Sequence, residues 1–170
     1  MNNFLPDDFT VNHYLFDKLY INRIEDDYYT KNSYPIVYIL YDLSTSTAYV
    51  GESTSALSRM LNHLSHPEKK RLKYVYIISS KNFNKSAALD IESNLIKYMV
   101  ADETFVLLNG NAGIADHNYY QKDTYNEVFH NIWENLKLQK VVTKNIIEID
   151  NSDLFKYSPY KALTIDQHKA

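Results

Sequence analysis

The chain has 170 residues, of which 45% are hydrophobic and 23% charged, so a folded core is expected in one compact domain with extensions. The lack of cysteine excludes disulfides, thiolate zinc sites and cysteine nucleophiles, and the net charge of −3 argues against a non-specific DNA-coating protein. No apolar run is long enough to span a bilayer and no signal-peptide pattern opens the chain, which predicts a cytoplasmic location.

Residues 1–33 are predicted to form a helical N-terminal extension. Val11, Tyr14, Leu15 and Leu19 recur there at helical spacing. The sequence then changes character at residue 34, where β-prone runs begin. We therefore expect a separate extension in front of the central domain.

Residues 34–115 are predicted to form the central domain. Apolar runs at 36–41, 48–51 and 74–79 predict strands, and the polar turn 42–47 joins the first two in a hairpin. Helices are expected at 56–64 and 86–99. The predicted fold class is α+β (mixed α/β), with a small three-stranded antiparallel sheet flanked by helices.

Residues 116–170 are expected to form a C-terminal extension. Val128, Ile132, Trp133 and Leu136 form a helical stripe within 124–140. Residues 146–149 read as a short strand. Both extensions are thus predicted to be mainly helical.

The hairpin places two tyrosines on one face of the sheet. A six-residue loop pairs Tyr41 with Ala48, which sets Tyr38 opposite Gly51 and makes Tyr38 and Tyr49 diagonal neighbours. Gly51 leaves space above the sheet. Tyrosines are also ordinary packing residues in strands, so this arrangement alone does not decide between packing and function.

Three further residues carry groups that suit phosphate chemistry. Arg59 and His63 share one helical face at i, i+4; arginine matches phosphate, and histidine exchanges protons near neutral pH. Glu92 falls within an apolar helical stripe, so a cation is expected beside it. A solvated surface pair and a carboxylate at the edge of the stripe are the alternative interpretations. Candidate contacts to a nucleic-acid backbone are Lys69, Lys70, Arg71 and Lys73, which also read as a solvated turn.

In this order and spacing, the residues resemble the GIY-YIG nuclease superfamily. Ile36-Val37-Tyr38 and Tyr49-Val50-Gly51 correspond to its two signature strands, and Arg59 and His63 follow at the family's spacing. Glu92 matches the metal-binding glutamate, and Asn109 the asparagine that often follows it. Ile36 departs from the leading glycine of the first motif, and Glu52 is an unusual acidic residue after the second.

The resemblance implies a metal-dependent endonuclease that acts on nucleic acid, with DNA as the expected substrate, in repair, recombination or defence. Its implied catalytic residues are Tyr38, Tyr49, Arg59, His63 and Glu92. Glu92 would hold one Mg²⁺ or Mn²⁺, with Tyr38 as general base and Arg59 stabilising the phosphoryl charge. Asn109 would support the site or contact the nucleic acid.

A narrower resemblance concerns bacterial proteins in which such a domain precedes a schlafen-related, P-loop helicase-like ATPase. It rests on residues 84–92, 108–111 and 117–120, and on residues 157–164 as the entry to the second domain. No Walker A motif occurs in this chain. Two alternatives stay open: an inactive module that positions an ATPase on nucleic acid, and a protein-interaction domain.

Overall fold

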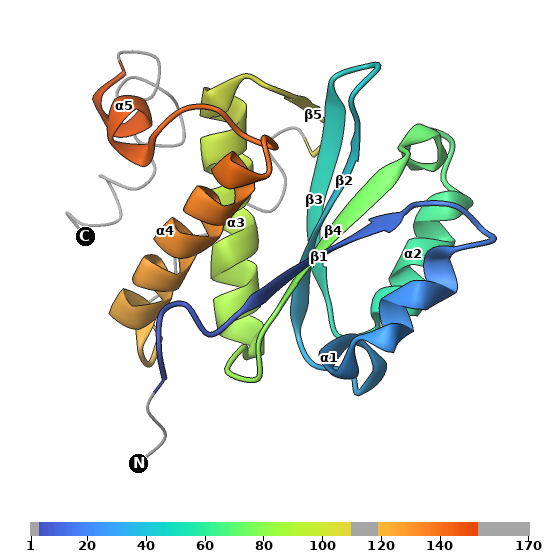
Figure 1. Cartoon of the computed structure of the whole chain (residues 1–170), viewed down its shortest axis with the longest axis horizontal. Helices are drawn as coiled ribbons and strands as arrows, with labels where there is room; N and C mark the ends of the chain where they lie inside the picture. Colours follow the sequence, from blue (N-terminus) through green and yellow to red (C-terminus); the bar gives the residue numbers. More distant parts are fainter. Residues whose placement is uncertain (1–3, 110–118, 153–170) are drawn as a thin grey trace.

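The computed structural model describes residues 4–109 and 119–152, which build a mixed sheet flanked by helices (Figure 1). The sheet has five strands in the order β1-β4-β2-β3-β5. The strands pair in antiparallel fashion, except for β3 with β5, which is parallel. The predicted α+β class is confirmed, but the predicted three-stranded antiparallel sheet is wrong because two more strands extend it, one at each edge.

The first additional strand is β1 (Thr10–Leu15), where a helix was predicted. It pairs along its whole length with β4 (Tyr74–Ser79), from Thr10 opposite Ser79 to Leu15 opposite Tyr74. The helix prediction was wrong because pairing with β4 overrides the local spacing of apolar residues. The chain then continues through η1 (Ile21–Asp26) and the four-residue α1 (Tyr28–Lys31), which Asp27 caps by accepting hydrogen bonds from Tyr29 N and Thr30 N.

The central hairpin has the predicted register. β2 (Ile36–Asp42) pairs with β3 (Thr47–Ser53), with Tyr38 opposite Gly51 and Leu40 opposite Tyr49. The carboxylate of Asp42 accepts hydrogen bonds from Ser44 and Thr45, which stabilises the turn between the strands. The helix α2 (Ala56–Leu64) and strand β4 also have their predicted bounds, with the short η2 (Lys69–Arg71) between them.

The second half of the described chain adds two long helices. α3 (Lys85–Asp102) begins at Asn84, whose side chain accepts a hydrogen bond from Ala87 N, and ends at Glu103 in the left-handed conformation. The short strand β5 (Val106–Leu107) follows, and α4 (Lys122–Leu138) forms near its predicted position. α5 (Ile146–Asn151) replaces the predicted strand at 146–149. Residues 157–164, on which the expected second domain partly rests, lie outside the described residues.

The sheet separates two hydrophobic cores. Val37, Ile39 and Val50 face α3 and α4, where Trp133 is fully buried. Tyr38 and Leu40 face α2, η1 and the turn after η2. Figure 1 shows α3 and α4 on one side of the sheet and α2 on the other. Side chains that alternate along β2 and β3 therefore enter different layers.

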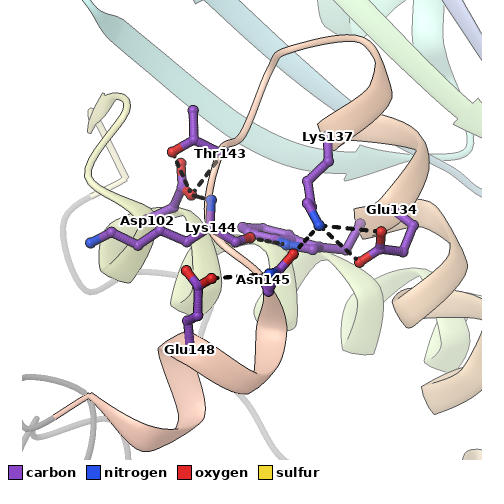
Figure 2. Close-up of polar contacts among 8 residues, drawn as sticks. Asp102, Glu134, Lys137, Thr143, Lys144, Asn145 and Glu148 are labelled. Carbon is purple, nitrogen blue, oxygen red and sulfur yellow. Dashed lines mark hydrogen bonds and ion pairs between the residues drawn. The ribbon is translucent and has the colours of Figure 1, made fainter.

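A buried carboxylate attaches the α4–α5 connection to the end of α3 (Figure 2). Asp102, which is 3% exposed, accepts hydrogen bonds from Thr143 N at 3.0 Å and Lys144 N at 2.6 Å. Thr104 also donates its hydroxyl hydrogen to this carboxylate. Next to it, Trp133 Nε1 donates to Lys144 O. These contacts join the C-terminal helices to the sheet domain as one packed unit. Among the described residues, no helix is long and apolar enough to cross a membrane.

Candidate functional site

A buried phenol–imidazole pair forms the centre of the candidate site. Tyr38 on β2 and His63 on α2 are 1% and 5% exposed, and Tyr38 Oη lies 2.7 Å from His63 Nε2. Tyr49 on β3 completes the group. Its ring packs edge-to-face on His63, with 5.3 Å between the ring centroids, and is tilted against Tyr38, with 6.3 Å between the centroids. The structure therefore brings together three of the five residues expected to be catalytic.

The ring of Tyr38 occupies the space that Gly51 leaves. A Cβ at position 51 would lie 2.2 Å from Tyr38 Oη and 2.3 Å from Cζ. Real carbon atoms do not approach so closely, so only glycine allows the ring to lie across β3 in this way. The pairing of Gly51 with Tyr38 thus fixes the direction of the phenol toward His63.

Two cations lie around this group. Lys69 Nζ sits 3.9 Å from the centroid of the Tyr49 ring, a cation–π contact. Arg59 is exposed on α2, and its charge acts on both phenols. Burial, followed by the charges of Lys69 and Arg59, lowers the pKa of His63 to about 4. His63 is therefore neutral at physiological pH, and its Nε2 either accepts from or donates to Tyr38 Oη, depending on the tautomer.

Burial also makes Tyr38 a weak acid. It raises the pKa of the phenol well above its usual range, and the neighbouring Tyr49 adds to the shift. The charge of Arg59 acts in the opposite direction. Tyr38 therefore cannot lose its proton at neutral pH unless another group takes that proton in the same step.

Glu92 approaches the group from the other layer. It lies on α3, which packs against the face of the sheet opposite Tyr38 and Tyr49. Its charge nevertheless raises the pKa of both phenols. Burial, followed by the charge of Glu52, raises the pKa of Glu92 to about 7. Among the five expected catalytic residues, Glu92 is thus coupled to the phenols through charge rather than through direct contact.

The outer edge of β3 is only partly paired beside this group. β5 pairs only with Thr47 and Ala48. Beyond Ala48, the side chain of Asn109 pairs with the outer edge of β3. Its Oδ1 accepts a hydrogen bond from Val50 N at 2.9 Å, and its Nδ2 donates one to Val50 O at 2.7 Å. Within the described ranges 4–109 and 119–152, no strand pairs with the outer edge of β3 beyond Ala48, whereas β2 pairs with its inner edge as far as Ser53. Gly51 therefore has a strand partner among the described residues only on the β2 side.

The donor atoms at Glu92 suit a hydrated metal ion. Within the described part of the chain, no group of three or more histidine or acidic residues gathers to enclose a cation. Lys85 forms an ion pair with the neighbouring Glu52, and its Nζ lies 2.7 Å from both carboxylate oxygens. One carboxylate with water as the remaining ligands is a common arrangement for Mg²⁺, whereas zinc and structural calcium sites need more protein ligands. Glu92 would supply one carboxylate ligand to such an ion.

The four residues of the predicted basic cluster lie in different surroundings. Lys69 contacts Tyr49, whereas Lys70 and Arg71 are exposed on η2. Lys73 lies at the opposite end of β2 from the site. Against the effect of burial, hydrogen bonds from Ser44 and Thr45 lower the pKa of Asp42 there, and the charge of Lys73 adds to this effect. The sequence gives a cue for the separate position of Lys69, because Pro67 turns the chain back after α2. It does not show that the lysine reaches Tyr49.

Comparisons with known proteins leave the family open: no protein-family model matches this chain, and neither the curated proteins nor the solved structures contain a significant match.

Proposed function

We propose that this chain is an endonuclease of the GIY-YIG type that hydrolyses phosphodiester bonds in nucleic acid, with DNA as its substrate. The observation that supports this proposal best is the contact between Tyr38 and His63. A buried phenol hydrogen-bonded to a neutral imidazole forms a path for a proton. Tyr49 packs beside this path, and the charges of Arg59 and Glu92 act on both phenols; these groups would bind phosphate or a cation.

In the proposed reaction, a water oxygen forms a bond to phosphorus, the bond from phosphorus to the leaving oxygen breaks, and the leaving oxygen takes up a proton from solvent. The water proton passes to Tyr38 Oη while the phenol proton passes to His63 Nε2, so no free phenolate forms. His63 alone is a weak base because burial, followed by the charges of Lys69 and Arg59, lowers its pKa. A bound phosphate would neutralise those cations and thereby raise the pKa of His63 when the substrate is in place.

The reaction also requires stabilisation of the negative charge on the phosphoryl group. Arg59 presents a permanent positive charge that would stabilise the negative charge developing on the phosphate oxygens. Glu92 would hold one Mg²⁺ or Mn²⁺, which when bound would supply further stabilisation of the phosphate and leaving oxygens. Tyr49, held against His63 and Lys69, would orient the substrate phosphate.

A cleavage assay with Glu92→Ala tests the proposal. Single-stranded, branched and duplex DNA are incubated with Mg²⁺, Mn²⁺ or a chelator. The parent protein should cleave at least one substrate only when metal is present. Glu92→Ala should abolish cleavage with an unchanged circular dichroism spectrum, whereas Glu127→Ala, an exposed glutamate on α4, should cleave like the parent. Equal cleavage by the parent and Glu92→Ala would refute the assignment.

One observation favours a second function. Tyr38 is 1% exposed and Glu92 belongs to the other layer, an arrangement that also suits residues kept for packing. The chain would then be a non-catalytic module that places a helicase-like ATPase on nucleic acid. DNA binding that weakens with salt, without cleavage in either metal, would support this alternative; no binding at all would favour a protein-interaction domain.

A further inference from the structure

We propose that Lys69 and Arg59 form a phosphate subsite over the exposed side of Tyr49, and that Lys69 positions the substrate strand for cleavage. This inference rests on the proposed function and assigns one lysine of the basic cluster a role that its neighbours do not share. The ligand is a phosphodiester group of a nucleic-acid strand.

The local fold holds Lys69 in place. His66 Nδ1 accepts hydrogen bonds from Glu68 N at 3.2 Å and from Lys69 N at 3.3 Å, which closes the turn after α2. Leu72, which is 2% exposed, anchors the other end of η2 in the core beneath α2. Lys69 is itself half-buried. A turn fixed at both ends thus directs this side chain onto Tyr49.

Among the described residues, the two cations form no direct ion pair. Within residues 4–109 and 119–152, neither Lys69 nor Arg59 forms an ion pair with a carboxylate. Burial lowers the pKa of Lys69, the charge of Arg59 adds to this effect, and the charge of Glu68 acts in the opposite direction. Two cations that repel each other and form no ion pair are stabilised by an anion bound beside them.

Phosphate is the anion that fits the surroundings best. Arg59 can bind it through two parallel hydrogen bonds, and Lys69 contributes a point charge. Tyr49, which Lys69 contacts, offers a phenol hydroxyl and a ring face. Lys70 and Arg71 are exposed on the same short turn and provide only a general positive field.

The test compares Lys69→Met with Lys70→Met. Methionine keeps an apolar stem over Tyr49 and removes only the charge. With the best-cleaved DNA, Lys69→Met should raise KM about tenfold with kcat changed less than about threefold, because a ground-state phosphate contact is lost. The slope of log affinity against log salt, measured by fluorescence anisotropy in a Glu92→Gln background, should fall by about 0.7–0.9. Lys69→Arg should restore most of the affinity.

Lys70→Met should have a smaller effect that disappears at high salt, since an exposed charge acts through a screened field. A purely structural role of Lys69 would lower the melting temperature of Lys69→Met and leave the salt slope unchanged. If the parent cleaves DNA but Lys69→Met behaves like Lys70→Met, the subsite is refuted while the nuclease assignment stands. If the parent neither binds nor cleaves DNA, both proposals fail.

Discussion

Replacing Gly51 with alanine should displace the phenol at the centre of the site. The new Cβ would lie 2.2 Å from Tyr38 Oη and 2.3 Å from Cζ, whereas carbon atoms pack at about 3.5–4.0 Å. The ring must therefore move by more than about 1 Å, yet Tyr38 is 1% exposed and packed in the core beneath α2. Overpacking of this kind costs about 1–3 kcal/mol of unfolding free energy, or roughly 2–4 °C in Tm per kcal/mol.

The same movement should break the 2.7 Å contact between Tyr38 and His63. If the proposed proton path is correct, cleavage should fall by about 100-fold, as expected for a misplacement of about 1 Å in an active site. Urea denaturation measures the stability change, and single-turnover cleavage measures the chemistry.

A second background makes the stability prediction specific. In Tyr38→Leu, the two closest ring atoms are absent, so Gly51→Ala should be neutral or stabilise the strand by about 0.5–1 kcal/mol. The sign of the alanine effect should thus reverse between the two backgrounds. An equal loss of stability in both would refute the claim that the ring of Tyr38 is what requires glycine.

Two further predictions concern Asp102 and Glu92. Asp102→Ala should lower the unfolding free energy by about 2–3 kcal/mol in urea denaturation, because Thr143 N and Lys144 N lose their acceptor, whereas Glu127→Ala should change it by less than about 0.5 kcal/mol. Burial raises the pKa of Glu92 to about 7, so below that pH a cation must displace a proton. The apparent Mn²⁺ affinity, measured by electron paramagnetic resonance, should rise about tenfold per pH unit up to about pH 7 and then level off. An affinity independent of pH, or one retained in Glu92→Gln, would contradict this role.

The central hairpin and its helices could be predicted because local rules determine them. The length of the turn between β2 and β3 fixes the register, so the pairing of Tyr38 with Gly51 follows from counting. α2 has the bounds that its apolar spacing and Pro67 indicate. The proximity of Tyr38 to Tyr49 was therefore available from the sequence before any tertiary contact was known.

The two ends of the sheet domain depend on tertiary contacts and could not be predicted. β1 carries apolar residues that fit helical spacing, and only the edge of β4 makes it a strand. The apolar run at Ile146 is short enough to fit either a strand or a helix, and packing against α3 and α4 selects the helix α5. β5 has two residues, too few for any sequence pattern.

Some features of the candidate site follow from local sequence patterns, and others depend on tertiary contacts. Arg59 and His63 share a helical face that the sequence reveals, but the contact of Lys69 with Tyr49 depends on how the turn after α2 closes. The position of Glu92 depends on the sheet as a whole, because α3 covers the face opposite the phenols. Spacing along the chain says nothing about which layer a helix joins.

The outer edge of β3 beside Gly51 is paired in two different ways. β5 pairs with Thr47 and Ala48, and the side chain of Asn109 pairs with both backbone groups of Val50. A side chain at position 51 would meet the ring of Tyr38, so the glycine and the asparagine meet different needs of one strand: the glycine admits the ring, and the asparagine satisfies the backbone where β5 has ended. The proposed site therefore depends on Asn109 as well as on Gly51, because Tyr49 lies on the same strand, next to Val50.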